Sequence, residues 1–171
     1  MKKNIVLAGL LAAMVCVATT FLHIPIVGGG YVHLGDTVIY LAAALLPTPY
    51  AMAAAAVGAG LADLLVAPMW APFTVLIKAL MVLAFTAKKE TLFCRRNALA
   101  PVLAGVIGIA GYNVAEAIIL WLSGSALATA GVTAVAAIPF NAMQEVVGGV
   151  AFVLLALALD RLQIKKRLAR R

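Results

Sequence analysis

The sequence predicts an all-helical membrane protein, a bundle of six transmembrane helices whose second helix is short. Of its 171 residues, 65% are hydrophobic and only 11% are charged, and the mean hydropathy is +1.12. Soluble domains carry about a quarter charged residues. Here, apolar runs of roughly 17–25 residues, long enough to cross a bilayer, follow one another almost without a break. We therefore expect residues 1–171 to form a single integral membrane domain.

The basic residues indicate how the chain is oriented. They gather at the N-terminus, in a central loop and in the C-terminal tail, and Lys78 is the exception. The positive-inside rule places such clusters in the cytoplasm. Both termini are therefore expected there, with an even number of spans between clusters. This distribution explains the net charge of +7 by topology and attraction to anionic lipid rather than by nucleic-acid binding.

The first half of the chain predicts three helices. Residues 4–22 form an apolar run that is too long for a signal peptide and lacks a clear cleavage site. The outside loop 23–35 contains the run Gly28-Gly29-Gly30. Helix 36–46 would cover only about 16 Å, too little for a hydrocarbon core of roughly 30 Å. This loop should therefore dip into the bilayer, toward the interior of the bundle. After the turn 47–49, helix 50–66 is rich in Ala and Gly at a spacing that lets helices approach closely.

The second half predicts three longer helices. The fourth helix follows the outside loop 67–72 and is expected to end near residue 87. The fifth should span 98–122 and the sixth 133–159, and a small-residue outside loop at 123–132 connects them. Cys16 lies in the first helix and Cys94 in the basic loop. Neither a disulfide nor a metal site is indicated by this spacing.

Polar side chains interrupt each of the last three helices. Such groups are costly in hydrocarbon unless they are partnered, and they usually face a bundle interior or a substrate path. At 1.5 Å per residue they lie roughly 9–18 Å below the outside ends of their helices. They can therefore converge in the outer half of the bundle. The candidate ligand-binding residues are these polar groups and the loop side chains above them: Tyr31, His33, Trp70, Lys78, Tyr112, Asn113, Glu116, Asn141, Gln144 and Glu145.

The charged residues also have structural interpretations. Lys78 can pair with Glu116 or Glu145, contact the ligand, or do both. Asp36 is expected to cap the N-terminus of the second helix, where a carboxylate meets unpaired amides. Asp63 is expected to fix the outside end of the third helix.

The uncharged candidates leave alternatives open as well. Asn113, Asn141 and Gln144 could join helices by hydrogen bonds. Trp70 and Tyr31 could belong to the interfacial aromatic belt instead of stacking on a ligand.

Three segments in order resemble the S component of energy-coupling factor (ECF) vitamin transporters. They are Gly35-Asp36 before a short helix, the run from Leu46 to Ala51, and Gly58-Ala59-Gly60-Leu61-Ala62-Asp63-Leu64-Leu65. The resemblance covers essentially the whole chain. It implies a multi-pass protein of a prokaryotic cell membrane that binds a vitamin or vitamin precursor from outside. It further implies docking on a transmembrane T component through Ala8 and Ala12, and association with two cytoplasmic ATPases.

The chain itself has no phosphate-binding loop, so no cofactor is expected in it and ATP chemistry must come from the partners. Pyridoxine, thiamine or its hydroxymethyl-pyrimidine precursor would suit the few polar groups, whereas folate has too many negative charges. Two other classes remain. A stand-alone ion-coupled carrier could use Glu116, Lys78 and Glu145, although no inverted repeat is evident. A membrane enzyme would need a catalytic constellation, and no Ser/His or His-Glu-x-x-His arrangement appears.

Overall fold

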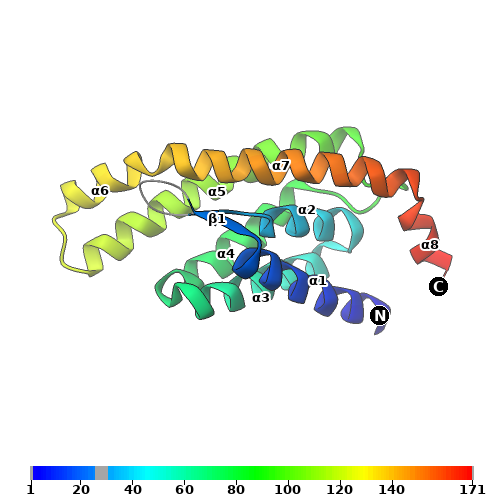
Figure 1. Cartoon of the computed structure of the whole chain (residues 1–171), viewed down its shortest axis with the longest axis horizontal. Coiled ribbons are helices and arrows are strands. Elements are labelled where there is room, and N and C mark those ends of the chain that lie inside the picture. The colour runs from blue at the N-terminus through cyan, green and yellow to red at the C-terminus, as the bar shows by residue number, and fades with distance from the viewer. Residues whose placement is uncertain (1, 26–30, 171) are drawn as a thin grey trace.

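The computed structural model describes residues 2–25 and 31–170. It is a helical bundle with one small hairpin (Figure 1). The run Gly28-Gly29-Gly30 lies outside the described residues. The elements are α1 (Lys2–Phe21), β1 (His23–Pro25), β2 (Tyr31–His33), α2 (Gly35–Leu45), α3 (Thr48–Val66), η1 (Pro68–Trp70), α4 (Ala71–Met81), η2 (Val82–Ala84), α5 (Arg95–Leu122), α6 (Leu127–Ala136), α7 (Ile138–Arg161) and α8 (Ile164–Arg170).

Six apolar helical segments correspond to the six predicted. Four are long and apolar enough to cross a membrane: α1, α3, α5 and the continuous stretch 127–161 that contains α6 and α7. The other two are shorter, namely α2 and residues 68–84. With 11 residues, α2 is about 16 Å long, which confirms the short second helix.

The predicted outside loop 123–132 is wrong in its second half, because α6 begins at Leu127. Small residues such as Gly and Thr suggested a loop there. In an apolar environment, however, backbone groups must be paired internally, and a helix does this. A break separates α6 from α7 just before Pro139, which occupies the first turn of α7 and has no N–H to continue the preceding helix.

Both chain termini lie at one end of the bundle, opposite the turn between α5 and α6 (Figure 1). The loop between η2 and α5 is bound at the same end. There the Asp160 carboxylate accepts hydrogen bonds from the N–H groups of Leu92 (2.7 Å) and Phe93 (2.8 Å). Lys165 donates to the carbonyl oxygen of Lys89 at 2.7 Å. We call this the basic end and the opposite end the outer end.

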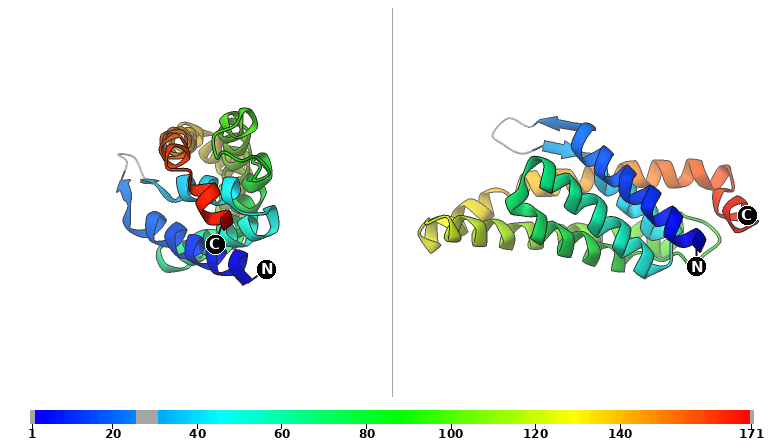
Figure 2. Two further views of the ribbon diagram at one scale, coloured as in Figure 1. Left: turned by 90° about the vertical axis from the view of Figure 1, so that its right-hand side faces the viewer. Right: turned by 90° about the horizontal axis from the view of Figure 1, so that it is seen from below.

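A hairpin leads from α1 into α2. The strands β1 and β2 pair antiparallel, with His23 opposite His33 and Ile24 opposite Val32. The sequence predicted only a loop here, since three-residue strands leave no recognisable alternation. Beyond the hairpin, α2 is enclosed by its neighbours (Figure 2), and the Tyr40 ring stacks on Phe85 with centroids 4.8 Å apart.

The α1 helix packs closely on α3 through small residues. A Cβ added to Gly58 would lie 2.5 Å from the carbonyl oxygen of Ala12 and 2.7 Å from the Cβ of Val15. Ala8 and Ala12 are both 8% exposed, so they belong to the buried side of α1. Their role in docking stays a prediction, and the large apolar side chains that α1 leaves exposed are instead Ile5, Val6, Leu10, Met14, Val17 and Phe21.

We expect Gly58→Ala to lower the free energy of unfolding by about 1–3 kcal/mol, the usual effect of overpacking. The added methyl group would meet backbone and Val15, which cannot swing away. Gly9→Ala is the matched control, because a Cβ there meets nothing within 4 Å. Thermal unfolding in detergent measures both. Equal midpoints for the two variants would contradict the close α1–α3 contact.

Candidate ligand-binding site

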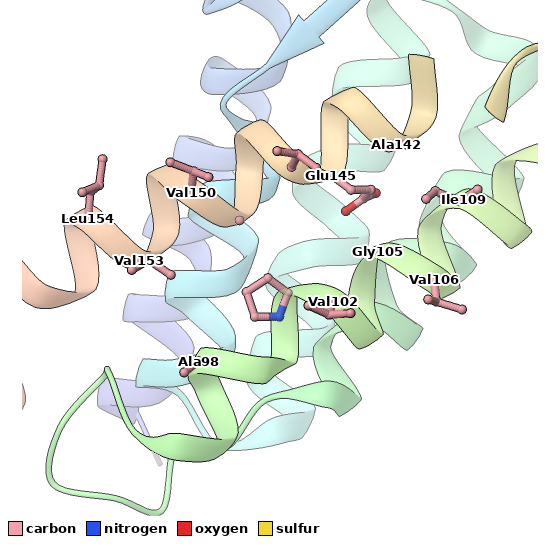
Figure 3. Close-up of a pocket in the computed structure, with 13 residues that line it drawn as sticks. Ala98, Val102, Gly105, Val106, Ile109, Ala142, Glu145, Val150, Val153 and Leu154 are labelled. Atoms are coloured by element: carbon pink, nitrogen blue, oxygen red, sulfur yellow. The ribbon is translucent and has the colours of Figure 1, made fainter. Parts of the chain in front are cut away.

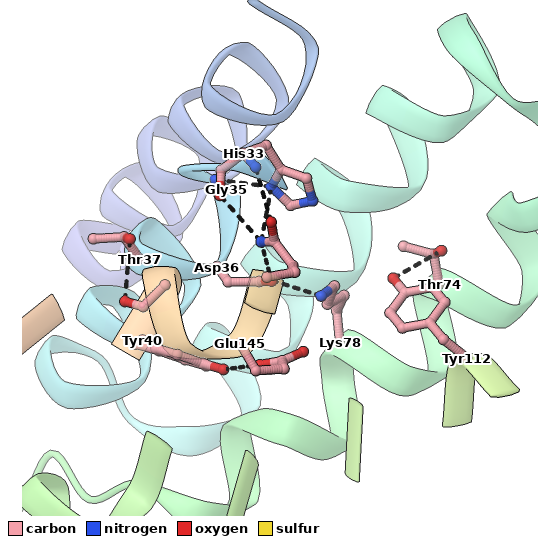
Figure 4. Close-up of polar contacts among 11 residues, drawn as sticks. His33, Gly35, Asp36, Thr37, Tyr40, Thr74, Lys78, Tyr112 and Glu145 are labelled. Atoms are coloured by element: carbon pink, nitrogen blue, oxygen red, sulfur yellow. Dashed lines mark hydrogen bonds and ion pairs between the residues drawn. The ribbon is translucent and has the colours of Figure 1, made fainter. Parts of the chain in front are cut away.

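A buried ion pair between α2 and α4 lies at the centre of the polar residues (Figure 4). The Nζ of Lys78 is 2.6 Å from an Asp36 carboxylate oxygen, and the two side chains are 3% and 0% exposed. The expected pairing of Lys78 with Glu116 or Glu145 is therefore wrong. The expected helix cap is wrong too: Leu34 occupies the cap position without a side-chain bond, and the Asp36 carboxylate turns inward. A lysine buried in an apolar bundle needs a carboxylate in contact, and Asp36 supplies it.

Gln144 connects α7 to the hairpin and to α2. Its side-chain nitrogen donates to the carbonyl oxygen of His33 at 3.0 Å and to the Asp36 carboxylate at 2.7 Å. Its side-chain oxygen accepts the N–H of His33 at 2.8 Å. Burial lowers the pKa of His33 to about 4, so the ring is neutral at pH 7. Its Nδ1 accepts the N–H of Gly35 at 3.1 Å. Gln144 thus holds β2 and the start of α2 against α7.

Aromatic rings flank the other side of Lys78. Its Nζ lies 5.0 Å from the centroid of the Tyr112 ring, within the range of a cation–π contact. The Tyr112 hydroxyl is 3.1 Å from the hydroxyl of Thr74. The ring of Trp70 lies beyond Tyr112, with centroids 6.0 Å apart. These contacts bring side chains of α4, α5 and η1 together.

Two amides meet between α5 and α7. The side-chain nitrogen of Asn141 donates to the side-chain oxygen of Asn113 at 2.8 Å. Both residues are half-buried. Each amide keeps further donor or acceptor capacity beyond this single bond.

The two glutamates are not part of the Lys78–Asp36 ion pair, although Glu145 lies close enough to both residues to interact with them electrostatically. Tyr40 donates its hydroxyl to the Glu145 carboxylate at 2.5 Å, and that carboxylate faces α5 at Gly108, where a Cβ would lie only 2.3 Å from it. Glu116 is half-buried. Among residues 2–25 and 31–170, Lys78 pairs with Asp36 and with neither glutamate.

Sequence reasoning did not place Asp36, Tyr40 or Thr74 among the site residues. A signal was available for the first two: they are four residues apart in a helix whose one other polar side chain is Thr37, and this spacing places both on one face. Tyr31 lies in β2 opposite Pro25, and its side chain lies outside what the structure describes.

Comparison with known proteins agrees with this architecture. The family model of the ECF-type riboflavin transporter S component matches residues 1–161. An uncharacterised protein of Pyrococcus woesei is 36% identical over 117 residues, 67% of this chain and 78% of that protein. A solved structure described as the S component of a bacterial ECF transporter aligns with a TM-score of 0.71 and 20% identity, covering 94% of this chain and 97% of that one. The chain therefore belongs to the ECF-type riboflavin transporter S component family and is a multi-pass membrane protein, the substrate-binding subunit of an ECF importer for a vitamin.

Proposed function

We propose that the chain binds a neutral, flat heteroaromatic vitamin, riboflavin first among them, beside Lys78 in the outer half of the bundle. The family model is named for riboflavin, which is not among the compounds that the sequence suggested. The observation that carries the proposal is the half-buried Asn113–Asn141 pair, which lies on the same helices as Tyr112 and Gln144. Amides on opposite helices can exchange their mutual bond for the donors and acceptors on the edge of a pyrimidine-like ring.

The charges near Lys78 favour an uncharged ligand. The Asp36 carboxylate already neutralises Lys78 at 2.6 Å, so the lysine offers no unpaired cation to a phosphate or carboxylate. Glu145 is held by Tyr40, which leaves little to balance the positive charge of thiamine. Trp70 and Tyr112, with ring centroids 6.0 Å apart, supply aromatic surface for a ring. Riboflavin has such a ring and carries neither charge.

The remaining parts of the transport cycle belong to partners. Proteins of this family work with a T component and ATPases. We propose that those ATPases hydrolyse ATP while this chain alone binds the vitamin. The clustering of Lys and Arg at the basic end supports cytoplasmic termini, and therefore an outer end that faces the outside of a prokaryotic cell.

A thermal-shift comparison without ATP tests the proposal. Riboflavin at 100 times its dissociation constant should stabilise the purified chain by about 2.7 kcal/mol. Riboflavin monophosphate and thiamine should shift the melting temperature far less, because each brings a charge that the site does not balance. Pyridoxine and hydroxymethyl-pyrimidine complete the panel. A melting curve that none of these compounds moves would contradict vitamin binding at this site, and a shift with thiamine alone would contradict the neutral ligand.

Two variants locate the binding site. Asn141→Leu should weaken riboflavin binding by roughly tenfold, the loss of one good hydrogen bond of about 1.4 kcal/mol. Met143→Leu, on the exposed side of the same helix, is the matched control and should bind like the unmodified chain. Titration calorimetry measures both. Unchanged affinity in Asn141→Leu would place the ligand away from the amide pair.

A further inference from the structure

An apolar groove runs between α5 and α7 (Figure 3). Its volume is about 530 Å³. Its walls carry side chains that are more than half exposed, among them Val102, Val106, Val146, Val150 and Leu154. Glu145 is the one lining residue with a charged side chain, and it is only 6% exposed. A groove with so few polar groups suits hydrocarbon and not a vitamin.

The groove has the length of one leaflet. Along α7 its lining extends from Ala142 to Leu154, about 18 Å at 1.5 Å per residue. Half of a hydrocarbon core of roughly 30 Å is about 15 Å. The lining ends toward the basic end, at Leu154 of α7 and Ala98 of α5. An acyl chain of the leaflet at the basic end would fit along this path.

Two arginines lie beyond that end of the groove. Arg95 begins α5, three residues before Ala98, and Arg161 ends α7. The bonds from the N–H groups of Leu92 and Phe93 to Asp160 hold these two helix ends together and engage both oxygens of the Asp160 carboxylate. Both arginines are exposed, and neither side chain makes a hydrogen bond or ion pair within the described part of the chain. Their charge is available to an anion at the headgroup level.

We propose that the α5–α7 groove binds one anionic phospholipid of the leaflet at the basic end. One acyl chain lies along Val102, Val146 and Val150, and the phosphate group lies between Arg95 and Arg161. The apolar lining would contact the acyl chain, and the two arginines would contact the phosphate group of the same molecule. This site is separate from the vitamin site, since Glu145 and its bond to Tyr40 close the groove toward α2.

Native mass spectrometry of the purified full chain in mild detergent tests this. The chain is offered phosphatidylglycerol and phosphatidylcholine at equal concentrations. One phosphatidylglycerol should remain bound, preferred by roughly 25-fold because each basic side chain near a membrane surface contributes about fivefold. Arg95→Gln with Arg161→Gln should bring the preference close to parity. Lys166→Gln with Arg167→Gln, exposed on α8, is the matched control and should keep it.

A second pair of variants tests the groove itself. Val146→Trp with Val150→Trp fills it and should reduce retention of either lipid at least tenfold. Met143→Trp with Leu157→Trp changes α7 side chains that are 40% and 41% exposed and do not line the groove, so retention should persist. Thermal melts show whether all variants remain folded. If the unmodified chain retains no lipid, or the filled groove retains as much as the control, the proposal is overturned and the groove is left for a partner helix or a second copy.

Discussion

Replacing Lys78 with methionine is expected to lower the free energy of unfolding by about 3–5 kcal/mol, the usual cost of breaking a buried ion pair by removing one partner. The variant leaves the Asp36 carboxylate, which is fully buried, without its cation 2.6 Å away. Tyr112 would also lose the ammonium group 5.0 Å from its ring. Reversible unfolding of the empty protein in detergent measures the change.

Neutralising the Asp36 carboxylate that Lys78→Met leaves unpaired should recover much of the lost free energy of unfolding. In Lys78→Met with Asp36→Asn, the asparagine oxygen can still accept the hydrogen bond from Gln144, and no buried charge remains unpaired. The double variant should therefore be more stable than Lys78→Met alone. If the double variant lost the sum of the unfolding free energies that the two single variants lose, the two residues would act independently. That result would contradict the ion pair as the source of the stability.

Gln144→Leu is expected to release the hairpin from α7. The change removes three hydrogen bonds, two with the backbone of His33 and one with Asp36. Each neutral bond contributes about 1 kcal/mol, and buried groups left unpaired cost about 1–3 kcal/mol. The amide of His33 should then exchange its hydrogen much faster, and the vitamin should dissociate faster from the purified chain.

Hydrogen exchange followed by mass spectrometry gives the first result, and stopped-flow fluorescence with riboflavin gives the second. Met143→Leu, at the neighbouring position, serves as the control. Exchange of the His33 amide at the rate of the unmodified chain would show that another contact holds the hairpin. An accelerated exchange with unchanged dissociation would separate the hairpin from ligand retention.

The membrane architecture was predictable from the sequence because it rests on composition and length. Apolar runs identified the spans, and the short run 36–46 identified the short second helix that the structure places at Gly35–Leu45. The first part of the helix at Leu127–Ala136, residues 127–132, was not predicted. A stretch rich in small residues is typical of a loop when nothing in the sequence indicates that it lies in lipid.

The polar side chains were predictable as a set, and their partners were not. Periodicity places Lys78, Gln144 and Glu145 on inward faces, but the pairing depends on which helices touch. Asp36 reaches Lys78 because α2 is enclosed by its neighbours, and Glu145 meets Tyr40 for the same reason. A helix of only 11 residues gives no sequence signal of its depth in the bundle.

The central claim is that this chain alone binds a neutral heteroaromatic vitamin. It is tested most directly by mass spectrometry of small molecules extracted from the chain after purification, without partner subunits, from cells grown with riboflavin, pyridoxine and thiamine in the medium. The account predicts riboflavin at close to one molecule per chain, and a much smaller amount from Asn141→Leu purified in parallel. A chain that carries none of these compounds, or that carries equal amounts in the variant, would contradict it.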